Sequence, residues 1–232
     1  MTESLLRRSP FRTGSAVAGS TGFEGSVVAE ACATAAAPRT PNGALAVLLA
    51  GNRRFVGGHA EHPHQTPTRV RQIAARQDPF AIVLGCADSR VGAELLFDQG
   101  LGDLFVNRVA GNLVDDLLLG SMEYAVEEFA PPLLIVLGHE RCGAIQSTIA
   151  AINGGGTAPG HIGTILAALE PIVAPYAKDA DAVEAGVRAN VKAQAAGILA
   201  QSGIVRERVE KGAMAVVGAR YNMDTGWVEV LG

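Results

Sequence analysis

Two short apolar runs constrain the fold of this chain more than any other feature. Residues 80–85 read FAIVLG and residues 133–138 read LLIVLG, so each run closes with a glycine. The continuous apolar character of the second run predicts a strand that is buried on both faces, as in a parallel sheet covered by helices. We therefore expect two parallel strands whose carboxyl ends meet at one edge of a sheet, where α/β proteins build their sites.

Helical and extended segments alternate along the chain from residue 41 onward. Apolar residues recur at helical spacing in residues 43–56, which predicts an amphipathic helix. Its apolar face has no obvious partner in the same chain, so we expect this helix to pack on a partner subunit. The other expected helices are 68–76, 92–97, 117–129, one running to about 152, 161–175, 180–201 and 204–210, and the expected strands are 80–86, 103–109, 133–138, 213–221 and 227–230. This alternation predicts an α/β fold with a mostly parallel central sheet flanked by helices and an antiparallel edge strand.

A residue of a metal-binding type follows each apolar run. Cys86 comes directly after the first run, His139 directly after the second, and Cys142 stands three positions beyond His139. Taken singly, a buried cysteine is typical of core packing. Together, two thiolates and an imidazole suit Zn²⁺, and a site with three protein ligands leaves a fourth position for water, which is typical of catalytic zinc. The third cysteine, Cys32, lies in a weakly structured N-terminal stretch, so we do not expect it to be a fourth ligand.

Length and charge exclude several classes of protein. A chain of 232 residues with 48% hydrophobic residues suits one domain plus an appendage, and it can bury a substantial core. A net charge of −4 gives no electrostatic reason to expect a nucleic-acid partner. Three cysteines do not make a disulfide framework. No apolar run reaches the roughly 18 residues of an integral membrane segment.

Residues 1–40 differ in character from residues 41–232, which we assign to a single zinc domain. The first segment is rich in Ala, Ser, Thr and Gly and carries Arg7-Arg8 near its start. Two interpretations stay open, a low-complexity cytoplasmic extension and a twin-arginine-like export signal with small residues at a cleavage site. Glu24 interrupts the apolar middle that an export signal needs, so we favour the cytoplasmic extension.

The sequence closely resembles the β-class carbonic anhydrases. The likeness is carried by Cys86-x-Asp88-x-Arg90 and His139-x-x-Cys142, and it extends from about residue 44 to the C-terminus. The intervening segments that share it are ELLFDQG at 94–100, GDLFV at 102–106, Arg108, AGN at 110–112 and SMEYA at 121–125. The resemblance implies a zinc-dependent lyase that reversibly hydrates carbon dioxide to bicarbonate and a proton by attack of zinc-bound hydroxide.

The resemblance also implies roles for residues beside the metal. Asp88 is expected either to occupy the fourth metal position, which closes the site, or to turn toward Arg90 and accept a hydrogen bond from the hydroxide. The backbone amide of Gly143, at the start of a helix, is expected to donate to a developing oxyanion. The metal ligands implied are therefore Cys86, His139 and Cys142, with Asp88 as a fourth ligand in the closed state.

A substrate pocket and an oligomer complete what the resemblance implies. The pocket is expected to contain Gln77, Phe105 and Tyr124, some of it contributed across a subunit interface of a homodimer or homotetramer. Phe105 and Tyr124 suit plain core or interface packing equally well. Two other functions stay open: hydrolysis of carbonyl sulfide or carbon disulfide on the same scaffold, and a zinc module without catalysis. The Asp88–Arg90 pair argues against the second, because a structural ion needs no such pair beside an exchangeable position.

Overall fold

The structure, a computed structural model, describes residues 37–232. These residues form a five-stranded sheet with the strand order β2-β1-β3-β4-β5. The strands are β1 (Ala81–Gly85), β2 (Leu104–Arg108), β3 (Leu133–His139), β4 (Ala215–Tyr221) and β5 (Val228–Leu231). Strands β1 to β4 run parallel, and β5 pairs with β4 in the antiparallel sense. The predicted α/β fold with an antiparallel edge strand is therefore confirmed. Residues 1–36, which carry Cys32 and on which both the expected cytoplasmic extension and the alternative export signal rest, lie outside the described residues.

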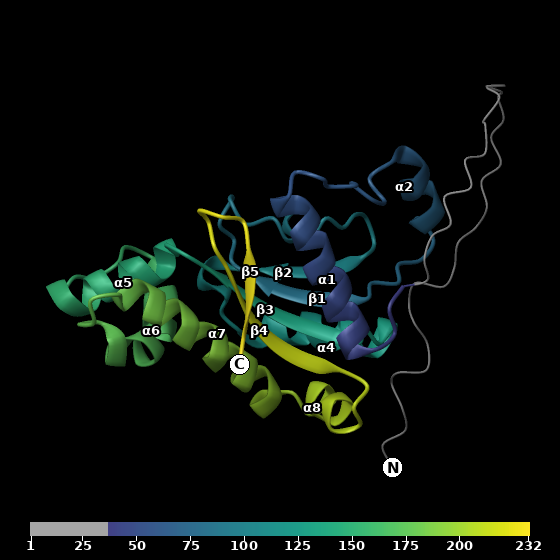
Figure 1. The fold of residues 1–232 in the computed structure, drawn as a ribbon. Coiled ribbons are helices and arrows are strands. Elements are labelled where there is room, and N and C mark those ends of the chain that lie inside the picture. Colours follow the sequence, from purple (N-terminus) through teal and green to yellow (C-terminus); the bar gives the residue numbers. More distant parts are fainter. Residues whose placement is uncertain (1–36) are drawn as a thin grey trace, which may run out of the picture. The chain divides into compact units, whose positions relative to one another are not determined.

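The described part of the chain contains eight α-helices, and Figure 1 shows where they lie around the sheet. They are α1 (Pro41–Val56), α2 (Pro67–Ile73), α3 (Ala93–Leu96), α4 (Asp116–Phe129), α5 (Gly143–Gly154), α6 (Ile162–Val173), α7 (Ala182–Gln201) and α8 (Gly203–Glu210). Each predicted helix is present, with ends that differ by a few residues. The helix expected over 161–175 ends at Val173, and Pro175 lies in a following 3-10 turn. Within residues 37–232, no helix combines the length and apolar character needed to cross a membrane.

Both faces of the sheet are buried, each against different helices. Ile82 and Leu84 of β1 join a cluster with α4, α7 and α8, whereas Val83 between them joins a cluster with α1 and α3. Figure 1 shows α1 crossing one face of the sheet and α7 lying along the other. Successive residues of a strand point to opposite faces, so a strand covered on both faces must be apolar throughout. This explains why the FAIVLG and LLIVLG runs do not alternate with polar residues.

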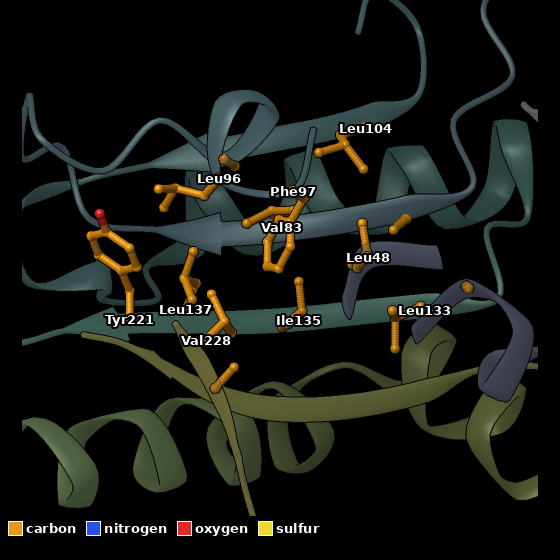
Figure 2. Packing of buried hydrophobic residues seen from close by; sticks show 14 of the residues in the cluster. Leu48, Val83, Leu96, Phe97, Leu104, Leu133, Ile135, Leu137, Tyr221 and Val228 are labelled. Atoms are coloured by element: carbon orange, nitrogen blue, oxygen red, sulfur yellow. The ribbon is translucent and has the colours of Figure 1, made fainter. Parts of the chain in front are cut away.

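Helix α1 packs on the sheet of its own chain. Its first turn is capped by Thr40, whose side chain accepts a hydrogen bond from the Gly43 amide at 3.2 Å. Leu48 is fully buried, and Figure 2 shows it on the same face as Val83 and Ile135. The expectation that this helix lacks a partner for its apolar face within its own chain is therefore wrong. Residue spacing identified the face, but only the tertiary structure shows what covers it.

A close approach and a buried amide fix where α1 sits. A Cβ atom on Gly51 would lie 1.7 Å from the carbonyl oxygen of Phe97, so only glycine fits this approach to the end of α3. The next residue, Asn52, donates to the carbonyls of Leu96 at 3.0 Å and Gly226 at 2.9 Å. Its own Oδ1 accepts from the Val228 amide at 2.9 Å, so one buried side chain ties α1 to α3 and β5.

Replacing Leu48 with alanine should test this packing. We expect the free energy of unfolding to fall by about 2–5 kcal/mol, because the cavity forms in a fully buried site. Denaturant unfolding measures the loss, with Leu117→Ala as the control, since Leu117 is 84% exposed and its truncation should change stability by less than about 0.5 kcal/mol. If α1 instead packed on a second subunit, the loss caused by Leu48→Ala would vary with protein concentration.

Candidate metal centre

Three side chains of metal-binding types meet at the carboxyl edge of the sheet. Cys86 directly follows β1, His139 is the last residue of β3, and Cys142 is the N-cap of α5. Strands β1 and β3 are adjacent and parallel, with Gly85 opposite Leu137, so both chains leave the sheet at the same edge. The Sγ atoms of the two cysteines and a ring nitrogen of His139 all lie within 4.8 Å of one another, and all three residues are buried.

The turn between β3 and α5 places Cys142 beside the strand ends. Arg141 has a φ of 51°, in the left-handed region, which reverses the chain within two residues of His139. Glu140 anchors this turn: its amide donates to the Tyr221 carbonyl at 3.0 Å, and its carboxylate accepts from the Met223 amide at 2.9 Å. The same carboxylate pairs with Arg220. The β4–β5 connection therefore holds the segment that carries two of the three candidate ligands.

His139 presents a free ring nitrogen to the two thiols. Its Nδ1 lies 2.8 Å from the carbonyl oxygen of Glu140, which makes Nδ1–H the donor and leaves Nε2 with the lone pair. Nε2 is fully buried and has no hydrogen-bond partner among the described residues. A buried polar atom without a partner is costly, and a carbonyl on the other ring nitrogen is the usual partner of a metal-bound histidine. The cluster therefore fits a metal ion that prefers sulfur and nitrogen ligands.

The pKa values of the two thiols are shifted in opposite directions. A hydrogen bond from Cys142 and backbone amide bonds lower the pKa of Cys86 to about 4, despite its burial. One of these amides is that of Gly111, whose nitrogen lies 3.3 Å from Cys86 Sγ. The same hydrogen bond to Cys86, together with burial, raises the pKa of Cys142. Without a metal ion the pair thus holds one thiolate and one thiol, so an ion that binds both sulfurs must displace a proton from Cys142.

Asp88 is turned toward Arg90 and away from the cluster. The Arg90 guanidinium donates to both carboxylate oxygens, at 2.9 and 2.7 Å, and the Arg90 amide donates to Oδ1 at 3.0 Å. These bonds from Arg90 hold the pKa of Asp88 well below its usual range. Asp88 Oδ2 is still only 3.9 Å from His139 Nε2. Of the two orientations expected for Asp88, the structure has the one in which the carboxylate turns toward Arg90.

Arg108 holds the loop that carries Cys86 and Asp88, a role that the sequence analysis missed. At the end of β2, its Nε donates to the Cys86 carbonyl at 2.9 Å and an Nη donates to the Asp88 carbonyl at 2.6 Å. The sequence signal was an arginine inside a motif shared with the family. The local sequence pattern does not indicate that Arg108 would bind the carbonyl groups of Cys86 and Asp88, which lie 22 and 20 residues earlier.

The expected pocket residues do not join the cluster within one chain. Phe105 of β2 lies opposite Ile82, four residues before Cys86, which corresponds to about 13 Å along the strand. Its ring centroid lies 6.4 Å from that of Tyr124, and Phe129 completes the aromatic group. Gln77 is exposed and precedes β1, so it lies toward the opposite edge of the sheet. Their place in a substrate pocket stays a prediction that requires a second subunit.

Gly143 begins α5 next to the cluster. It is exposed, and in the described part of the chain no atom beyond its two neighbours and the backbone of its own helix lies within 4 Å of the position that a Cβ would take. As the first residue of the helix, it has a backbone N–H with no partner inside the helix. This position is compatible with the expected donor role, which stays a prediction.

Comparisons with known proteins agree on one family. The family model described as carbonic anhydrase matches residues 81–228. A carbonic anhydrase 2 from Mycobacterium tuberculosis is 42% identical over 80% of this chain and 90% of its own length. A carbonic anhydrase from Mycolicibacterium smegmatis is 39% identical over 82% of this chain and 93% of its own length. Among solved structures, the Coccomyxa β-carbonic anhydrase in complex with acetazolamide superposes with a TM-score of 0.62 at 30% identity, covering 81% of this chain and 86% of that one. A tetrameric β-carbonic anhydrase from Sordaria macrospora superposes with a TM-score of 0.63 at 26% identity, covering 81% of this chain and 96% of that one.

Metal binding at this cluster should depend on pH in a defined direction. Burial alone would lower the pKa of His139, but the neighbouring Cys86 sulfur and the Glu140 carbonyl outweigh it and raise this pKa. The pKa of Cys142 is raised as well. Protons on these two groups compete with the ion, so zinc affinity should fall as the pH falls, and binding at neutral pH should release at least about one proton. Chelator competition and a pH indicator measure the two effects.

Variants of the cysteines provide the control for this prediction. Cys142→Ser should bind zinc more weakly and release about one proton fewer, because the group that holds the displaced proton is gone. Cys32→Ser should retain the affinity and proton release of the parent protein. Equal zinc content and proton release in Cys142→Ser and the parent protein would contradict the assignment of Cys142 as a ligand.

Proposed function

The chain belongs to the β-carbonic anhydrase family, and on this premise we propose that it hydrates carbon dioxide with a zinc ion held by Cys86, His139 and Cys142. It is a carbonic anhydrase, a lyase, and hydration of carbon dioxide to bicarbonate is the general reaction of its family. The observation that carries the zinc assignment is the convergence of two thiols on a buried imidazole nitrogen that has no hydrogen-bond partner within residues 37–232. Thiolate and imidazole ligands favour zinc over magnesium or calcium, which prefer oxygen.

The donor set supports a catalytic ion and not a structural one. Structural zinc sites are closed by four protein ligands, whereas three leave a position for water. When bound, the ion supplies a Lewis acid that activates water as a nucleophile at neutral pH. Asp88 is the residue that could close the fourth position, and its two bonds to Arg90 hold it away.

Asp88 is proposed to orient the attacking water. Because the pKa of this carboxylate is well below its usual range, it remains ionised near neutral pH and acts only as a hydrogen-bond acceptor. An acceptor fixed by Arg90 holds the proton of the attacking oxygen on its own side, so the oxygen lone pair faces the substrate. Arg90 is 55% exposed at its side chain, and its contribution is to keep the carboxylate in this orientation.

The surroundings of the cluster suit a small apolar substrate. Cys86 and Cys142 share a buried cluster with Ile145, Leu169 and Val187, which keeps water away from one side of the site. A linear, uncharged molecule such as carbon dioxide enters such surroundings at little desolvation cost. The Gly143 amide at the start of α5 is proposed to donate to the substrate oxygen as negative charge develops on it.

We also propose that the enzyme is a homodimer or homotetramer. Phe105 lies about 13 Å along the sheet from the level of Cys86, and Tyr124 of α4 packs against Phe105 and not in the metal cluster. Tyr124 is 48% exposed, so its ring is available to a second subunit. One solved relative is described as tetrameric. An oligomer in which these aromatic rings and Gln77 approach the partner's cluster would complete a substrate pocket.

Turnover should require zinc. Stopped-flow measurement on the zinc-loaded protein should show hydration of carbon dioxide, with loss of the activity after chelation and recovery on adding zinc. Magnesium should not restore it, since the three proposed ligands offer sulfur and nitrogen atoms and magnesium prefers oxygen. Full activity in protein without measurable metal would contradict the proposal. Turnover of carbonyl sulfide far above that of carbon dioxide would show that carbonyl sulfide is the substrate, and the proposed metal ligands would be unaffected.

Asp88→Asn should separate turnover from metal binding. We expect zinc content to stay at the level of the parent protein while turnover falls by about a hundredfold, because the variant loses the charged acceptor but keeps all three ligands. The matched control is Asp224→Asn, which removes a carboxylate that also accepts two bonds from one arginine, Arg141, on the exposed β4–β5 turn. Equal turnover in Asp88→Asn and Asp224→Asn would show that Asp88 has no part in the reaction.

A further inference from the structure

Helix α7 carries two buried amide side chains on the face that packs toward the metal centre. Asn190 is 1% exposed and Gln194 is 7% exposed. Their buried neighbours along the helix are apolar, among them Val187, Val191 and Ile198. Burying an amide costs free energy unless each polar atom finds a partner. The two side chains therefore need an explanation that core packing alone does not give.

The two amides form a hydrogen-bonded chain that ends on the loop after β2. Gln194 Oε1 accepts from the Val114 amide at 3.0 Å, and Gln194 Nε2 donates to Asn190 Oδ1 at 2.9 Å. Asn190 Nδ2 then donates to the Gly111 carbonyl at 2.8 Å. A backbone N–H can only donate and a carbonyl can only accept. Val114 and Gly111 thus fix the orientation of both amides, with no alternative arrangement that keeps all three bonds.

Gly111 links this chain to a candidate metal ligand. Its carbonyl is held by Asn190, and its own N–H donates to Cys86 Sγ at 3.3 Å. Its φ of 76° is in the left-handed region, which glycine adopts without strain. A Cβ at this position would approach Leu169 Cδ1 to 3.2 Å and Ala144 Cβ to 3.3 Å. The loop is therefore tightly enclosed at Gly111, whose N–H is bound to Cys86 and whose carbonyl is bound to Asn190.

We infer that Asn190 is a positioning residue for the metal centre, which acts by holding Gly111 so that its amide donates to the Cys86 sulfur. This inference rests on the proposed function, because it requires Cys86 to be a ligand. An N–H bond to a ligating sulfur draws electron density from the thiolate, and hydrogen bonds of this kind tune metal–sulfur centres. With two thiolates in the ligand set, such a bond limits the negative charge passed to the ion and preserves its Lewis acidity.

Cobalt provides a probe that reports on the sulfur itself. In a Co²⁺-substituted protein, thiolate ligands give a sulfur-to-metal charge-transfer band whose energy rises when the sulfur accepts a hydrogen bond. Asn190→Leu should therefore shift this band to lower energy. It should also weaken cobalt binding in a chelator competition by about 10-fold, the low end of the effect of removing a group that orients a metal ligand.

The matched control is Asn52→Leu. Asn52 is buried to the same 1% and also ties separate segments by side-chain hydrogen bonds, but it does so between α1, α3 and β5, on the other face of the sheet. Both variants should lower the temperature of unfolding. Only Asn190→Leu should move the charge-transfer band, because a general loss of stability does not alter the hydrogen bonding of the sulfur.

A second variant keeps the test decisive if Asn190→Leu fails to fold. Gln194→Met retains Asn190 but removes the donor that holds its Oδ1, so the band should shift in the same direction by a smaller amount. A band at the parent position in both α7 variants, or in Gln194→Met when it alone folds, would overturn the role of Asn190. A parent protein without any sulfur-to-cobalt band would overturn the proposed zinc ligands, which is a different outcome.

Discussion

The parallel pairing of β1 with β3 is the constraint on which the candidate metal centre depends. In the observed register Gly85 lies opposite Leu137, so Cys86 and His139 leave the sheet side by side. Packing on α7 opposes a shift of β3, because a Cβ at Gly138 would come within 2.5 Å of Val191 Cγ2. A slip that brought Leu137 to this place would clash with the helix. The register is therefore fixed by close packing as well as by backbone hydrogen bonds.

The loops that follow β1, β2 and β3 are held by contacts with other parts of the chain. Arg108 binds the two carbonyls of the loop after β1, and the Glu140 carboxylate fastens the turn after β3 to the β4–β5 connection. Asn190 of α7 donates to the Gly111 carbonyl and so holds the loop after β2. Three separate elements thus restrain three neighbouring loops. Groups that orient metal ligands in this way contribute to metal affinity, so we expect the loss of any one of them to weaken metal binding.

Charge at the centre is distributed unevenly before any ion binds. Cys86 accepts hydrogen bonds and has a lowered pKa, whereas Cys142 keeps its proton and has a raised one. The negative charge of Asp88 is matched by Arg90, which turns the carboxylate out of the space that an ion would use. In the proposed enzyme, this arrangement gives the ion three ligands and leaves room for water. The same carboxylate remains close enough to His139, at 3.9 Å, to act on what binds there.

By itself the sequence determined the order of helices and strands and the pairing of two metal-type residues with two strand ends. These features are local, since periodicity and glycine positions depend on neighbouring residues and Cys86 and His139 each adjoin an apolar run. Only the tertiary structure decided what covers α1, which is the sheet of the same chain. It also decided which side chains orient the ligand loops: Asn190 lies 79 positions from the Gly111 carbonyl that it holds. Such contacts arise from the way distant segments pack together, and no spacing within either segment encodes them.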